Sequence, residues 1–231
     1  IVHKISLFIE KPGAISSNEL NQLRELNEKY KMLIAFGYNH RFHSAMLKAN
    51  ELIKNEDLGS PMFARGRYGH GGRVGYDKEW RSDKSISGGG ELIDQGPHLI
   101  DLTHLYLGQS DEIEGFASTL FWDMNVDDNA FITIKTKKRC ISHLQLSCTE
   151  WRNLFSFEIY FSKAKLHING LGGSYGLETL TLFRMSAEMG PPLIQSWSWP
   201  GVEQSWNRET KDGKNNKKIA EGVIKEIKDR L

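Results

Sequence analysis

The order of apolar and polar positions divides the chain into two parts that meet near residue 114. The first part opens with a nearly unbroken apolar run over residues 5–9, which predicts a strand covered on both faces. Ser16, with Glu19 three residues later, forms a capping-box pattern before leucines at helical spacing, so a helix is expected there. A second apolar run covers residues 32–36. Strand, helix and strand at this spacing predict a βαβ unit with two parallel strands.

The rest of the first part predicts a helix, a strand, a loop and a further helix. Apolar residues on one face mark the helix, namely Ala45, Met46, Ala49, Leu52 and Ile53. Residues 61–68 predict a strand, and residues 69–87, which show no period, predict a long loop. Loops of that length in compact domains are uncommon and often functional. Three glycines at 88–90 then precede a predicted helix over about 91–107.

Beyond residue 114 the pattern changes to strands. Short apolar and alternating runs predict them over residues 114–122, 130–136, 139–147, 155–161, 165–169 and 180–185. The Lys137-Lys138 step predicts a tight hairpin turn, which favours a mainly antiparallel meander. Apolar residues every four positions over 219–231 predict a closing amphipathic helix. The chain is therefore expected to belong to the α+β class, with a small α/β portion at its start.

Composition and charge narrow the range of partners. The chain has 231 residues, 39% of them hydrophobic and 26% charged, with a net charge of +1. This balance is typical of a globular protein and argues against binding to nucleic acid or to a membrane surface. No apolar run approaches the roughly 20 residues that cross a membrane. Cys140 and Cys148 would lie about 27 Å apart on one strand, beyond disulfide reach, so we expect a reduced, cytoplasmic protein.

The first candidate site lies at the ends of the two predicted parallel strands, because ligands of open α/β sheets bind beyond the carboxyl ends of the strands. The first strand ends at Lys11, and the second leads into Asn39 and Arg41. We therefore expect these three side chains at one crevice. The alternative for Lys11 is an ordinary solvated surface lysine.

The second candidate site follows the three glycines. Asp94 and His98 are four residues apart and would share one face of a helix, with Asp101 one turn further along. An imidazole beside a carboxylate can take up a proton near neutral pH. Pro97 predicts a helix start or a kink at this point. The alternative, a capped helix with a half-buried packing histidine, stays open.

Two other sequence patterns are better explained by a structural role than by binding of a cofactor or a metal. The glycines over 170–176 imitate a dinucleotide fingerprint, but the third glycine falls one place late and a strand follows, so a turn is expected. His40 and His43 lack a third metal ligand at a convincing spacing. No metal site is predicted.

Three short motifs in register resemble the Gfo/Idh/MocA oxidoreductase family, which includes relatives of glucose-fructose oxidoreductase and inositol dehydrogenase. They are Glu10-Lys11-Pro12, then Asn39-His40-Arg41, then the glycines at 88–90 leading to Asp94-x-Gly96-x-His98. The similarity extends to about Trp206. It implies that residues 1–39 are the C-terminal remnant of a Rossmann domain that binds a dinucleotide. Residues 40–231 would form a substrate-binding and oligomerisation domain, whose open, mainly antiparallel sheet is flanked by helices and pairs subunits into a homodimer or homotetramer.

The resemblance also implies an activity. The protein would be an NAD- or NADP-dependent dehydrogenase that oxidises a hydroxyl of a sugar, nucleotide sugar or polyol. His98 would be the general base, Lys11 would contact the substrate hydroxyl and the nicotinamide, and Asp94 would bind or orient substrate and histidine. The implied catalytic residues are Lys11, Asp94 and His98; the cofactor-binding residues are Glu10, Lys11 and Pro12; and the substrate-binding residues are Asn39, Arg41, Asp94 and His98.

The chain departs from the family pattern at its start. The glycine-rich fingerprint of the family lies upstream of the Glu-Lys-Pro motif, whereas this chain begins at Ile1 without Met. We therefore expect a piece of a longer protein that is inactive alone. Two alternatives stay open: a non-catalytic relative used for carbohydrate binding or oligomerisation, and a metal-assisted lyase or epimerase built on Asp94 and His98.

Overall fold

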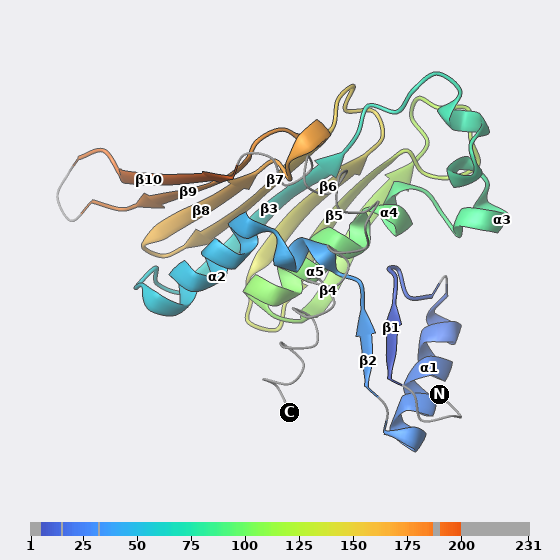
Figure 1. Ribbon diagram of the computed structural model, residues 1–231, viewed down its shortest axis with the longest axis horizontal. Helices are drawn as coiled ribbons and strands as arrows, with labels where there is room; N and C mark the ends of the chain where they lie inside the picture. Colours follow the sequence, from blue (N-terminus) through green and yellow to red (C-terminus); the bar gives the residue numbers. More distant parts are fainter. Residues whose placement is uncertain (1–5, 15, 32, 187–189, 200–231) are drawn as a thin grey trace, which may run out of the picture.

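The computed structural model describes residues 6–14, 16–31, 33–186 and 190–199. Two sheets organise this part of the chain. A large sheet of eight strands carries helices on one face, and a small sheet of two strands stands beside it with its own helix (Figure 1). The arrangement of a mainly antiparallel sheet under helices confirms the predicted α+β class.

The small sheet is the predicted βαβ unit. Strand β1 (Leu7–Ile9) pairs in parallel with β2 (Ile34–Phe36), and helix α1 (Ser17–Tyr30) connects them. The helix begins where the capping pattern placed it, because the Ser16 side chain accepts a hydrogen bond of 3.2 Å from the backbone N–H of Glu19. This connection brings the carboxyl ends of both strands to one edge, next to the large sheet (Figure 1).

The large sheet follows the predicted strands, except that the strand predicted over 114–122 lies four residues earlier, at Ser110–Ser118. Its strands are β3 (Pro61–Gly69), β4 (Ser110–Ser118), β5 (Asn129–Thr136), β6 (Ile141–Ser147), β7 (Leu154–Phe161), β8 (Ala164–Asn169), β9 (Glu178–Arg184) and β10 (Leu193–Trp199). Strand β10 was not predicted; it is an edge strand with mostly exposed side chains, so no buried face marks it in the sequence. The spatial order is β10-β9-β8-β7-β3-β6-β5-β4, antiparallel except where β3 runs parallel to β6.

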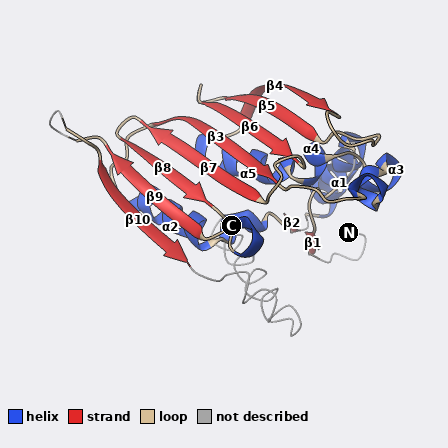
Figure 2. Ribbon diagram, turned by 90° about the horizontal axis from the view of Figure 1, so that it is seen from above, coloured by secondary structure: helices blue, strands red, loops and turns tan. Residues whose placement is uncertain are grey.

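Helices α2 (Ser44–Asn55), α4 (Glu91–Asp94) and α5 (Gly96–Leu107) cover one face of the large sheet, as Figure 2 shows. The core lies between these layers and includes the fully buried Met46, Leu99, Leu102, Phe157 and Leu166. Gly66 on β3 lets α5 approach closely, since a Cβ there would lie 3.2 Å from Leu99. The opposite face carries the exposed Phe116, Phe131 and Ile141 and no helix of the described residues.

Two predicted elements differ from the structure. The stretch over 69–87 was predicted as a loop, but it contains the short helical turns η2 (Tyr76–Lys78), η3 (Trp80–Ser82) and α3 (Lys84–Ser87). Polar side chains that bond to nearby backbone groups hold these turns, as when Asp83 caps α3 by accepting from Ser85 N–H at 2.8 Å. The predicted single helix over 91–107 is divided into α4 and α5, because Pro97 has no N–H to continue the helical ladder.

Three further predictions concern the cysteines, the chain end and the membrane. Cys140 and Cys148 are both free and buried. The predicted closing helix over 219–231 lies outside the described residues. Among the described helices, none combines the length and the apolar character needed to cross a membrane.

Candidate active site

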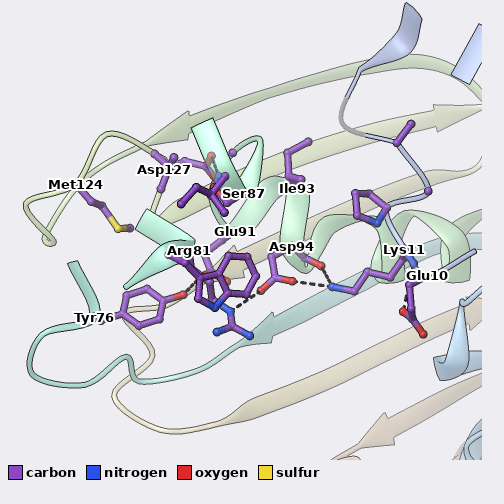
Figure 3. Close-up of a pocket in the computed structure, with 18 residues that line it drawn as sticks. Glu10, Lys11, Tyr76, Arg81, Ser87, Glu91, Ile93, Asp94, Met124 and Asp127 are labelled. Atoms are coloured by element: carbon purple, nitrogen blue, oxygen red, sulfur yellow. Dashed lines mark hydrogen bonds and ion pairs between the residues drawn. The ribbon is translucent and has the colours of Figure 1, made fainter. Parts of the chain in front are cut away.

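A cavity of about 370 Å³ lies between the end of β1 and the segment that leads into α4 (Figure 3). Its lining includes Glu10, Lys11, Pro12, Tyr76, Trp80, Arg81, Glu91, Asp94 and Asp127. The volume is at the lower end of the range for small-molecule sites. The cavity therefore has room for a ring-sized ligand, and it joins both motifs that the sequence marked.

Lys11 and Asp94 meet directly at this cavity (Figure 3). The Lys11 Nζ donates to Asp94 Oδ1 at 2.7 Å and also to the backbone carbonyl of Asp94. Burial alone would raise the pKa of Asp94, but the charge and hydrogen bond of Lys11, helped by Arg81, outweigh it and hold this pKa below its ordinary value. Lys11 is thus not an unengaged surface lysine, since it binds an ionised carboxylate 83 positions away.

Arg81 is a cavity residue that the prediction of site residues did not include. Its Nε lies 3.7 Å from Asp94 Oδ2, on the side opposite Lys11, and its guanidinium lies 4.5 Å from the centroid of the Trp80 ring. The carboxylate of Asp94 is therefore held between two cations. The adjacent Trp80 and Arg81 were the only local sequence feature that marked this side of the cavity, because the segment around them is polar and has no hydrophobic period.

His98 lies in the first turn of α5 and is only 5% exposed. It does not line the cavity; its ring lies against that of His40, tilted by 39° with 3.9 Å between the centroids. Burial and the charge of Lys11 lower the pKa of His98 to about 3, against the opposing effect of Asp94. The imidazole is consequently neutral at physiological pH and close enough to Lys11 to feel its charge.

Asn39 and Arg41 are brought near His98 but not to the cavity lining. They belong to the turn η1 (Asn39–Phe42), in which Asn39 Oδ1 accepts from His40 Nδ1 at 3.1 Å. Arg41 Nε donates to Asp101 Oδ2 at 2.6 Å, and a second bond joins the same two side chains. Asp101 is thus paired with Arg41, and the fork-like contact ties η1 to α5.

The glycines at 88–90 permit a close approach of backbone segments. A Cβ at Gly90 would lie 1.8 Å from the carbonyl oxygen of Asp127. The Asp127 carboxylate accepts from the N–H groups of Gly90 at 3.1 Å and Leu92 at 2.7 Å, which satisfies donors at the start of α4. Asp94 is the last residue of this short helix, so its position depends on this contact.

Replacing Gly90 with Ala should therefore displace α4 and lower the free energy of unfolding by about 1–3 kcal/mol, the usual cost of overpacking. Urea unfolding monitored by fluorescence measures this. Gly96→Ala is the matched control, because its Cβ would make only ordinary contacts at 3.4 Å, and its midpoint should change little. Equal midpoints for both variants would contradict the account of the glycine motif.

Stability should also depend on pH through the buried imidazoles. Burial and neighbouring charges lower the pKa of His40 and of His98 in the folded state, so the unfolded chain binds more protons below its own pKa of about 6.5. Their contribution is complete above that pH and is lost as the pH falls. At pH 5 the loss from His98 is about 2 kcal/mol, and His40 adds a loss in the same direction. Urea unfolding at pH 7.5 and 5.0 should show this loss, and His40→Phe should show a smaller one; an equal loss in both proteins would be inconsistent with a neutral, buried His40.

Comparison with known proteins supports the assignment of these motifs. Residues 46–167 match the GFO/IDH/MocA C-terminal domain. Glucose-6-phosphate 3-dehydrogenase of Bacillus subtilis is 33% identical over 106 residues, which are 45% of this chain and 30% of that protein. Oxidoreductase P35 of Formosa agariphila is 26% identical over 113 residues, which are 47% of this chain and 35% of that protein.

Solved structures share the fold. Levoglucosan dehydrogenase in complex with NADH and L-sorbose superposes with a TM-score of 0.74 and 19% identity, over 85% of this chain and 55% of that one. The match spans about a third of the length of the two curated relatives and about half of this solved chain. The domain match covers more than half of the present sequence, and it contains the glycines, Asp94 and His98. This chain belongs to the Gfo/Idh/MocA oxidoreductase family.

Proposed function

We propose that this chain forms the substrate-binding part of an NAD- or NADP-dependent dehydrogenase that oxidises a hydroxyl group of a sugar, nucleotide sugar or polyol. The observation that carries this proposal is the contact of Lys11 with Asp94 at the cavity, beside a neutral imidazole at His98. Residues 1–39 would end a dinucleotide-binding domain, and residues 40–231 would form the substrate domain. Relatives support the class, since one is named for a sugar phosphate and another was solved with NADH and a sugar.

The residues present fit the reacting end of a nicotinamide cofactor. Glu10, Lys11 and Pro12 line the cavity together with the flat ring of Trp80, and its volume of about 370 Å³ suits a ring rather than a whole dinucleotide. The turn after β1 carries one glycine, Gly13, and no Gly-x-Gly-x-x-Gly sequence that would cradle the phosphates. Bound there, the nicotinamide ring would accept the hydride that leaves the carbinol carbon.

The chemistry left to this chain is positioning and proton transfer. The Lys11 ammonium would donate a hydrogen bond to the reacting hydroxyl and stabilise the negative charge that develops on its oxygen. His98 would accept the hydroxyl proton as the carbonyl forms, because its imidazole is neutral. Asp94 would hold Lys11 in place through the 2.7 Å contact. For this transfer the hydroxyl must lie between Lys11 and His98.

The open sheet face is our proposed oligomer interface. Phe116 is 80% exposed there, and Phe131 and Ile141 are also exposed, so a second copy of the chain would bury apolar area on this face. A homodimer or homotetramer would result. The two free, buried cysteines suit a reducing, cytoplasmic environment.

The test uses the product of the complete reading frame and the 231-residue chain side by side. The former should bind NAD⁺ or NADP⁺ and reduce it with one member of a panel of sugars, sugar phosphates, nucleotide sugars and polyols. The latter should show no turnover. Failure of the complete product to bind either nucleotide would contradict the proposed function, whereas turnover by the 231-residue chain would contradict the domain assignment alone.

A further inference from the structure

His40 and His98, from two distant segments, form a close pair of tilted imidazole rings. Their ring centroids are 3.9 Å apart at an interplanar angle of 39°, and both side chains are buried. Each ring has one nitrogen, Nε2 of His40 and Nδ1 of His98, that is buried without a hydrogen-bond partner among the residues described. Unpaired buried polar atoms are costly and call for a physical explanation.

The hydrogen bond to Asn39 determines which nitrogen of His40 carries its proton. Asn39 Oδ1 lies 3.1 Å from His40 Nδ1 and can only accept, so Nδ1 bears the hydrogen. His40 is neutral, since burial and the neighbouring His98 hold its pKa well below the ordinary value. Nε2 of His40 therefore presents a lone pair.

His98, in turn, needs a hydrogen-bond acceptor for one of its ring nitrogens. A neutral imidazole has a single N–H, and a nitrogen that serves as base must be the one without it. The buried Nδ1 faces no other partner within the described chain, which leaves Nε2 as the nitrogen for the substrate. Nδ1 then carries the hydrogen and needs an acceptor. The lone pair of His40 Nε2, on the ring whose centroid lies 3.9 Å from that of His98, is an unpaired acceptor next to it.

We propose that His40 is a positioning residue, whose Nε2 accepts a hydrogen bond from Nδ1–H of His98 and leaves Nε2 of His98 free to act as the base. This inference rests on the proposed function and deepens it. Forming this bond requires the tilted rings to turn edge to edge and their centroids to separate beyond the present 3.9 Å; hydrogen bonds of catalytic groups in ligand-free sites are often poorly aligned. His40 thus does for His98 what a carboxylate does for the histidine of a triad.

Asp94 is not available for this role. Its Oδ1 accepts from Lys11 at 2.7 Å, and its Oδ2 lies 3.7 Å from Arg81 Nε, so both carboxylate oxygens face cations. His40, in contrast, is held in place from several sides. The Arg41–Asp101 contact fixes its turn to α5, and the ring of Tyr68 lies 5.0 Å from that of His40.

The direct test is the ¹⁵N NMR spectrum of the ring nitrogens in the histidine-labelled product of the complete reading frame. We expect His98 to hold its proton on Nδ1 in the wild type. His40→Phe keeps an aromatic ring beside His98 but removes the acceptor, so the proton of His98 should shift toward Nε2. Turnover should then fall at least about 10-fold with KM little changed, which is part of the 10²–10⁴-fold that a general base supplies.

His40→Gln and Tyr68→Phe complete the design. The Gln side chain restores an acceptor oxygen, so it should recover part of the turnover and the Nδ1–H form. Tyr68→Phe removes one polar atom from the same cluster but not the acceptor, and both readouts should stay at the wild-type level. A wild-type His98 protonated on Nε2, or a His40→Phe variant with wild-type tautomer and turnover, would overturn the inference. The tautomer is measured without substrate, so the absence of turnover in every protein would count against the proposed function instead.

Discussion

Replacing His98 with Ala should lower the turnover of the proposed dehydrogenase by about 10²–10⁴-fold, the contribution expected of a general base. Affinity for the nicotinamide cofactor should change little, because His98 is not among the residues that line the cavity proposed for the nicotinamide ring. Steady-state kinetics together with a fluorescence titration of the reduced cofactor separate the two effects.

His104→Ala is the matched control for this substitution. His104 lies on the same helix, six residues further along, where its Nε2 bonds to the Ser110 hydroxyl at 2.5 Å. Its loss should leave turnover near the wild-type level. If His98→Ala weakened cofactor binding as much as it lowered turnover, His98 would not be the base.

Replacing Lys11 with Met should lower turnover by about 10²–10³-fold, since the developing negative charge on the substrate oxygen loses its hydrogen-bond donor. It should also move the acid limb of the kcat/KM profile toward neutral pH. The charge of Lys11 is one cause of the low pKa of His98, so its removal raises that pKa and lets protons compete at higher pH. A pH series of kcat/KM measures both effects.

Lys48→Met is the matched control, because it removes a lysine that lies outside the proposed site. Lys48 forms a pair with the exposed Glu51 on helix α2, outside the cavity, and its substitution should change neither turnover nor the pH profile. A Lys11→Met enzyme with lower turnover but an unmoved acid limb would show that the ammonium does not act on His98.

Local sequence patterns were sufficient to predict the structure where a single short segment determines it. The Ser16 cap, the parallel pair β1–β2 and the strands β5 to β9 follow from capping chemistry and from hydrophobic alternation. Strand-end geometry and helical spacing each predicted a separate candidate site, and only the family resemblance joined Lys11 with Asp94, which the structure brings into contact. The resemblance then placed both motifs in one family.

Contacts between residues far apart in the chain could not be predicted from the sequence. Arg41 is still predicted to lie near the substrate; its pairing with Asp101, 60 positions away, is a contact that no local period reports. The close contact of the His40 and His98 rings was missed for the same reason. The Trp80–Arg81 wall lies in a segment held by side-chain hydrogen bonds, which leave no hydrophobic pattern to detect.

A crystal structure of the complete protein with a nicotinamide cofactor and the sugar that its activity panel selects tests the account most directly. We predict that one sugar hydroxyl lies within hydrogen-bond distance of both Lys11 Nζ and His98 Nε2, with its carbon facing the nicotinamide ring. A sugar bound in the cavity with no hydroxyl near His98, or bound elsewhere on the molecule, would contradict it.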